Sequence, residues 1–170
     1  MPSSKDFSLT SNNLPIAIVM GSYSDYETLK AAEVYFKKNK IRYKTQVISA
    51  HRTPKKMYQF CKTAHEKYSL IVAGAGGSAH LPGMIASLTR LPVIGVPIQT
   101  RSLNGIDSLL SIVQMPNGIP VATVAIGAAE NAARLALKIL SVSDKKLQLV
   151  FEQDVKLNTK LIKKMNLKLK

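Results

Sequence analysis

The chain has 170 residues, 46% of them hydrophobic, and this length and composition favour one domain with a sizeable core and exclude disorder for most of it. A single cysteine, Cys61, excludes a disulfide framework and a multi-cysteine zinc site. No apolar run approaches the roughly 18 residues of a membrane span, and residues 1–14 lack the apolar stretch of a signal peptide. The sequence therefore predicts a soluble, cytoplasmic protein without a membrane partner.

The charge is strongly positive: 24 Lys and Arg against 10 Asp and Glu give a formal net charge of +14. Such a balance suggests either an anionic partner or a lysine-rich solvated surface. A basic nucleic-acid-binding module is one functional hypothesis. Against it, aromatic residues make up only 6% of the chain, and no helix-turn-helix, RNP or zinc-finger pattern is present. We therefore favour the solvated surface, expect no nucleic-acid partner, and keep the module as an alternative function.

Short apolar runs alternate with amphipathic stretches along the chain. The run at 15–20 predicts a buried strand, and Ser24 with Glu27 has the spacing of a capping box that opens a helix. A second strand is predicted at 43–48, before a helix that begins at Thr53 and Pro54 and ends near Lys67. The remaining predicted elements, in chain order, are a strand at 69–73, a helix at about 80–89, a strand at 92–96, a helix at 106–113, a strand at 121–125 and a helix at 128–140.

This alternation of short strands and helices predicts βαβ units. We expect a three-layer, doubly wound, flavodoxin-like α/β domain over residues 15–142, with a parallel five-stranded sheet and helices on both faces. Residues 1–14 are predicted to be a flexible N-terminal segment. Residues 143–170 combine lysines with apolar positions at helical spacing, which predicts an extra basic amphipathic helix that packs on a neighbouring subunit.

Ligands of open α/β sheets bind at the carboxyl ends of the strands, which directs attention to three loops. In the first loop, Gly21 allows close backbone approach, and the hydroxyls of Ser22 and Ser24 lie beside a helix N-terminus that suits a phosphate. Asp25 can accept hydrogen bonds from ribose hydroxyls. The structural alternative is that Ser24 only caps its helix and Ser22 is only a turn residue.

The second loop places His51 and Arg52 together at a strand end, where neither side chain can be buried without partners. Arginine offers a fixed fork to phosphate oxygens, and histidine titrates near neutrality. This pair predicts an anion-binding residue beside a proton carrier. His65, on a helix with ordinary neighbours, is interpreted as structural, and Cys61 as a small core residue.

The third loop is rich in glycine, with Gly74, Gly76 and Gly77 before a helix that begins at His80. It resembles a dinucleotide fingerprint only loosely, because it follows the third strand and no acidic residue ends the next one. A P-loop and any cluster with metal-ligand spacing are also absent from the sequence. The residues alone thus predict an enzyme for a phosphorylated, nucleoside-like small molecule that uses histidine acid/base chemistry and no metal.

The segments GSYSD, SAHRTP, AGAGGSAHLPGM, PVIGVPI and LSIVQMPNGIPVATVAIG resemble a known family over about residues 15–140. It is the family of 5-(carboxyamino)imidazole ribonucleotide mutases of purine biosynthesis, also called the catalytic subunit of phosphoribosylaminoimidazole carboxylase. HLPGM is similar to the bacterial mutase branch. The resemblance implies an isomerase that converts 5-(carboxyamino)imidazole ribonucleotide into 5-amino-4-carboxyimidazole ribonucleotide without a cofactor, as a homo-octamer. A carboxylase that uses free carbon dioxide is the alternative within the same fold.

By the same resemblance, His51 and His80 are the catalytic histidines, Arg52 binds the phosphate and Asp25 the ribose. The substrate-binding positions it implies are Ser22, Ser24, Asp25, Ser49, Ala50, Arg52, Gly76, Gly77, Ser78 and Leu81. The chain departs from the family pattern at Ser78, where alanine is usual, and at Thr100 and Arg101, which replace a Ser-Lys pair. It is also about two residues shorter between Gly127 and Asn131, which leaves the contacts at that helix start open.

Overall fold

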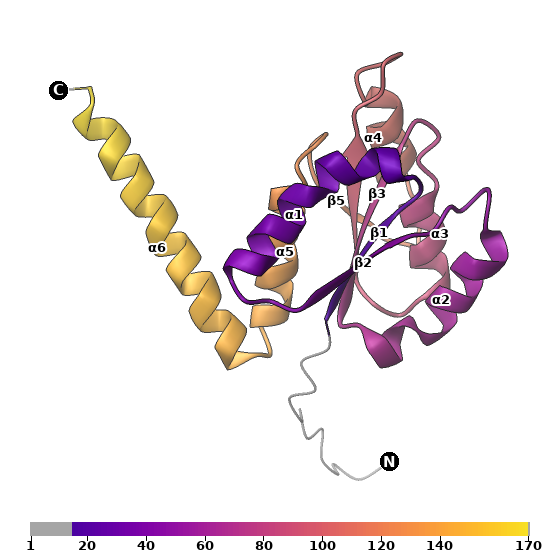
Figure 1. The fold of residues 1–170 in the computed structure, drawn as a ribbon, viewed down its shortest axis with the longest axis horizontal. Coiled ribbons are helices and arrows are strands. Elements are labelled where there is room, and N and C mark those ends of the chain that lie inside the picture. The colour runs from indigo at the N-terminus through magenta and orange to yellow at the C-terminus, as the bar shows by residue number, and fades with distance from the viewer. Residues whose placement is uncertain (1–14, 170) are drawn as a thin grey trace, which may run out of the picture.

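Five strands form one parallel sheet in the order β2-β1-β3-β4-β5 in the computed structural model, which describes residues 15–169 (Figure 1). Their bounds are β1 Ile16–Met20, β2 Tyr43–Val47, β3 Leu70–Gly76, β4 Val93–Ile98 and β5 Ala122–Thr123. The chain runs outward from β1 to β2 and then crosses back to β3 on the other side of β1. This is the flavodoxin-like strand order, and it confirms the predicted doubly wound fold.

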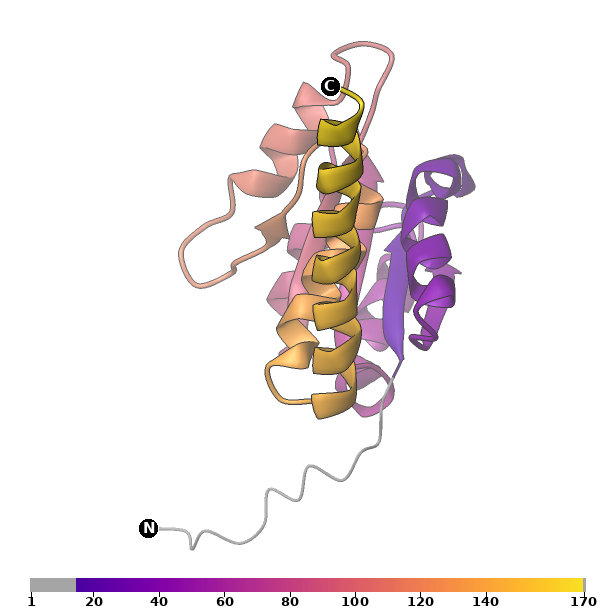
Figure 2. The same cartoon turned by 90° about the vertical axis from the view of Figure 1, so that its left-hand side faces the viewer.

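Helices cover both faces of the sheet (Figures 1 and 2). On one face lie α1 (Tyr26–Lys38) and α5 (Ala129–Ser141), and on the other α2 (Pro54–Lys67), α3 (Leu81–Leu88) and α4 (Ile106–Val113). Strand β1 shows why two cores form. Its side chains alternate, so that Ile16 and Ile18 join the core under α1 and α5, while Ala17 and Val19 join the other.

Three strands differ from the prediction by two residues or more at one end, and β1 and β2 differ by one. β4 continues to Ile98, past the predicted end at 96. β3 continues to Gly76, past the predicted end at 73, because Ala75 and Gly76 still pair with β4. Glycine inside this strand leaves room for Leu29 of α1, because a Cβ on Gly74 would lie 2.8 Å from Cδ1 of Leu29 and would displace that side chain. β5 is shorter than the predicted 121–125, because only Ala122 and Thr123 pair with β4 at the edge of the sheet.

The first helix starts differently from the prediction. The capping box consists of Ser22 and Asp25, not Ser24 and Glu27. The Ser22 amide donates to Oδ2 of Asp25 at 3.0 Å, and the Ser22 hydroxyl accepts from the Ser24 amide at 3.3 Å. A short 3-10 turn, η1 (Tyr23–Asp25), therefore precedes α1. The two serines and the aspartate are held together before any ligand binds.

A last helix, α6 (Lys145–Leu167), follows α5 and projects away from the domain (Figure 1). Its first turns pack on the chain's own core, where Leu147 is buried and Val150 and Phe151 are partly buried. Beyond them, Leu161 and Ile162 are about half exposed, at 52% and 55%. Within the described residues, no helix is both long and apolar enough to cross a membrane.

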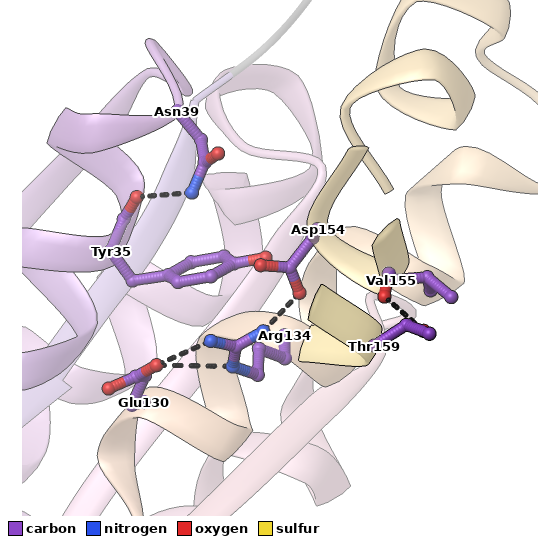
Figure 3. Close-up of polar contacts among 7 residues, drawn as sticks. All are labelled: Tyr35, Asn39, Glu130, Arg134, Asp154, Val155 and Thr159. Atoms are coloured by element: carbon purple, nitrogen blue, oxygen red, sulfur yellow. Dashed lines mark hydrogen bonds and ion pairs between the residues drawn. The ribbon is translucent and has the colours of Figure 1, made fainter. Parts of the chain in front are cut away.

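An ion pair fixes α6 against α5 (Figure 3). The Arg134 guanidinium pairs with Asp154 of α6 and donates to Glu130 Oε1 at 2.7 Å. It also lies 4.8 Å from the ring centroid of Tyr35 in α1, which points towards Asp154. One arginine thus connects three helices.

Candidate active site

The carboxyl ends of β1 to β4 surround a cavity of about 620 Å³. All twelve site residues predicted from the sequence line it, although they come from three separate loops: Ser22, Ser24, Asp25, Ser49, Ala50, His51, Arg52, Gly76, Gly77, Ser78, His80 and Leu81. Strand order explains this gathering. β2, β1 and β3 are neighbours, so the loops that follow them meet at one edge of the sheet.

Asp25 is the acidic residue of the cavity lining and is only 8% exposed. Burial raises the pKa of its carboxyl, while hydrogen bonds from Ser22, Ser24 and Gly21 and the charge of Arg52 act in the opposite direction. The Ser24 hydroxyl lies 2.9 Å from the Ser22 hydroxyl and 3.4 Å from Oδ1 of Asp25. The first loop therefore presents two hydroxyls and one carboxyl as a fixed group.

Arg52 bridges the first and second loops. Its Nη2 donates to the Gly21 carbonyl at 2.9 Å, and its Nε lies 3.4 Å from the Ser49 hydroxyl. The same hydroxyl accepts from the Arg52 amide at 3.2 Å. Thr53 completes the turn, because its hydroxyl donates to the Ser49 carbonyl at 2.9 Å. These contacts hold the guanidinium against the backbone of the first loop at Gly21.

The two histidines of the site contact each other. His51 Nε2 lies 2.9 Å from His80 Nδ1, with the rings edge to face at 88° and their centroids 5.1 Å apart. A hydrogen bond between imidazole nitrogens requires one to donate and the other to accept. The pair is therefore a short path for a proton between the second and third loops. His65 lies on α2 beside Glu66, outside the cavity lining, as its structural interpretation predicts.

The loop after β4 also lines the cavity, with Ile98, Gln99, Thr100 and Arg101. The sequence interpretation noted Thr100 and Arg101 only as departures from a pattern and did not assign them to the site. The rule that ligands bind at strand carboxyl ends could have included them. Thr100 is fixed by Asp107 of α4, whose Oδ1 accepts from its hydroxyl at 2.8 Å.

Taken together, the cavity lining has two arginines and one aspartate, with hydroxyls and a histidine pair beside them. Positive charge in a concave site attracts anions. The buried Cys61, whose pKa is raised to about 11 by burial, is a core residue away from this site. The fold and site thus define an α/β protein whose cavity combines a histidine pair with charges that suit a small anionic molecule.

Comparisons with known proteins agree with this class. The family model described as AIR carboxylase matches residues 15–160. N5-carboxyaminoimidazole ribonucleotide mutase from Saccharolobus solfataricus is 58% identical over 78% of this chain and 84% of its own. The Escherichia coli K12 protein of the same name is 54% identical over 82% of this chain and 85% of its own. The chain belongs to the AIR carboxylase family.

The solved structures lead to the same family. The crystal structure of Treponema denticola PurE superimposes with a TM-score of 0.83 at 29% sequence identity. The match covers 91% of this chain and 98% of that one. The family resemblance stated from the sequence motifs is thereby confirmed.

Proposed function

We propose that this protein is an isomerase of purine biosynthesis that converts 5-(carboxyamino)imidazole ribonucleotide into 5-amino-4-carboxyimidazole ribonucleotide. The observation that carries the proposal is the His51–His80 contact of 2.9 Å at the wall of an anion-binding cavity. The names of relatives that are 54–59% identical support the same reaction.

The proposed substrate fits the charges of the cavity. Arg52 binds the phosphate together with the hydroxyls of Ser22 and Ser24, because guanidinium and phosphate match in charge and geometry. The Asp25 carboxyl accepts from the ribose hydroxyls. The imidazole ring then lies towards the glycine-rich loop, where Gly76 and Gly77 line the cavity without side chains.

The proposed reaction breaks the N–C bond of the carbamate and releases carbon dioxide inside the cavity. The neighbouring ring carbon, which is electron-rich because of the adjacent amine, attacks the carbon dioxide and forms the new C–C bond. The ring carbon then loses its proton, which restores aromaticity. The amine nitrogen gains one proton in place of its carboxyl group, so the reaction neither consumes nor releases protons overall. One histidine can therefore carry the proton, and we assign this role to His51 with His80 as its partner.

This mechanism needs no external nucleophile, because the substrate supplies both the attacking carbon and the carbon dioxide. The protein contributes orientation and confinement. We accordingly propose a reaction without a cofactor.

The alternative is a carboxylase that takes carbon dioxide from solution, and an isotope experiment separates the two. Carbamate labelled at its carboxyl carbon is supplied with excess unlabelled bicarbonate. The mutase transfers the label to the ring carbon. Product with the isotopic composition of the bicarbonate pool would overturn the mutase proposal and leave the carboxylase.

We also propose that residues 15–142 form the catalytic domain and that the helix within 143–170 packs on a neighbouring subunit of a homo-octamer in the cytoplasm. The exposed apolar residues of the second half of α6 support this arrangement. The segment 1–14, predicted to be flexible, lies outside the described residues.

A further inference from the structure

Ser108 is a buried polar residue that the proposed mechanism does not use. Tyrosines aside, the buried polar or charged residues among residues 15–169 are Asp25 and Ser108, and Ser108 is 0% exposed. Asp25 lines the cavity, whereas Ser108 lies behind it in α4. A buried hydroxyl in a helix of mostly apolar residues destabilises the fold unless it is hydrogen-bonded, so its partners indicate its role.

The Ser108 hydroxyl connects two walls of the cavity. It accepts from the Gly77 amide at 2.9 Å and donates to the Ile98 carbonyl at 2.7 Å. One turn later, the Ser111 hydroxyl lies 3.3 Å from the Gly77 carbonyl and 2.7 Å from the Asp107 carbonyl. Helix α4 thus holds the Gly77 amide through Ser108, while the single proton of the Ser111 hydroxyl goes mainly to the closer Asp107 carbonyl.

Gly77 in turn sets the path of the chain to His80. It has a φ of +66°, a conformation that favours glycine. Its carbonyl accepts from the Ala79 amide at 2.8 Å, and the Ser78 carbonyl accepts from the His80 amide at 2.8 Å. These tight turns leave little freedom between Gly77 and the imidazole that contacts His51.

We propose that Ser108 is a positioning residue that fixes the Gly77 peptide and thereby holds His80 within hydrogen-bonding distance of His51. The inference rests on the proposed role of the histidine pair. It also implies that the Gly77 amide faces α4 and is not the amide that contacts the substrate, since Ser108 already accepts from it.

The test is Ser108→Ala, measured by kinetics and by NMR. Without the hydroxyl, Gly77 and Ile98 each lose a buried partner, and the loop shifts. We expect kcat to fall about 10-fold or more with KM changed much less, because a misplaced catalytic group affects the reacting step most. The chain has three histidines. The imidazole signals of His80 and His51 should move, whereas those of His65 on α2 should stay.

Two further variants complete the experiment. Ile16→Val removes one buried methyl group at the opposite end of the sheet and is the control for general destabilisation. Ser108→Cys keeps a side chain of similar size with a weak hydrogen-bond donor, so it should lose less activity than Ser108→Ala. If Ser108→Ala does not fold, Ser108→Cys takes its place in the test. Unchanged His80 signals, or a loss of kcat no larger than in Ile16→Val, would overturn the positioning role. Absence of turnover by the unmodified protein would instead contradict the proposed function.

Discussion

At the scale of single residues, His51 carries the chemical part of the proposal. His51→Asn keeps a similar shape and a nitrogen donor but cannot take up a proton near neutral pH. We expect binding of the nucleotide to remain and kcat to fall about 10²–10⁴-fold. Single-turnover kinetics with a separate binding measurement check this. His65→Asn on α2, outside the cavity lining, is the matched control. A His51→Asn protein that retains more than a tenth of the activity would remove His51 from the mechanism.

Asp25 gives a prediction about pH and stability. Because burial raises its pKa in the folded chain above the ordinary value of 3.8, the ionised form is less favourable in the folded state than in the unfolded one. The contribution of Asp25 to the free energy of unfolding therefore falls as pH rises from about 3.8 through the raised pKa.

Asp25→Asn removes this titration while it keeps an oxygen for the Ser22 amide. We compare the melting temperatures of Asp25→Asn and of the unmodified protein. As pH rises from 3 to 7, the variant should gain melting temperature relative to the unmodified protein, by an amount that depends on the size of the Asp25 pKa shift. The exposed Glu27→Gln, in the first turn of α1, is the control. A difference that is constant with pH, or that falls, would show that ionised Asp25 is not disfavoured by folding.

Twelve residues of the cavity lining were predicted from the sequence. Eight followed from the rule that parallel strands bring their carboxyl ends to one edge, and Ser49, Ala50, Ser78 and Leu81 were added by the family resemblance. The sequence interpretation missed two kinds of residue. Thr100 and Arg101 follow β4 in a loop without the histidine or glycine patterns of the other three. Ser108 is one serine within an apolar helix, and its importance depends on a contact with Gly77, 31 positions away. A contact between residues so far apart leaves no pattern in the sequence around either residue, so it could not be predicted.

At the scale of elements, the helices were predicted more closely than the strand ends. Helices α2 and α4 begin and end where their apolar periodicity and Pro54 predicted. The end of β3 was missed because three residues of the glycine-rich segment are strand, held by pairing with β4. Glycine usually weakens a strand, but here Gly74 makes room for the close approach of the Leu29 side chain.

The Arg134–Asp154 pair predicts how α6 is held. Asp154 is largely buried, with 12% of its side chain exposed, and it faces a guanidinium that also contacts Glu130 and Tyr35. Asp154→Asn should loosen the first half of α6 and increase amide hydrogen exchange there, while the sheet keeps its protection. The control is Glu152→Gln on the same helix, whose carboxylate accepts only an exposed hydrogen bond from Gln148 among the contacts found in the described residues. Equal exchange in both variants would show that apolar packing alone holds the helix.

At the scale of the whole molecule, the charge of +14 and the apolar surface have separate origins. The positive charge is spread over exposed lysines, while the cavity uses Arg52 and Arg101. The exposed apolar side chains gather on α4 and the second half of α6, including Ile106, Val113 and Ile162. Exposed apolar side chains that share one face of a helix are typical of interfaces between subunits. The charge therefore accounts for the attraction of anions, and the exposed apolar side chains support the proposed assembly.

The proposed assembly leads to the last prediction. Leu161 in the second half of α6 is 52% exposed, so Leu161→Glu removes nothing from the core of its own chain. If a neighbouring subunit covers this face, the buried carboxylate will oppose association. The unmodified protein should sediment as a closed oligomer at micromolar concentration, and Leu161→Glu as smaller species with the same circular dichroism. Lys163→Gln lowers the charge of the same helix by the same one unit at an exposed position that faces away from Leu161, and it should leave the assembly intact. A monomeric unmodified protein, or equal dissociation of both variants, would contradict an interface formed by the apolar face of α6.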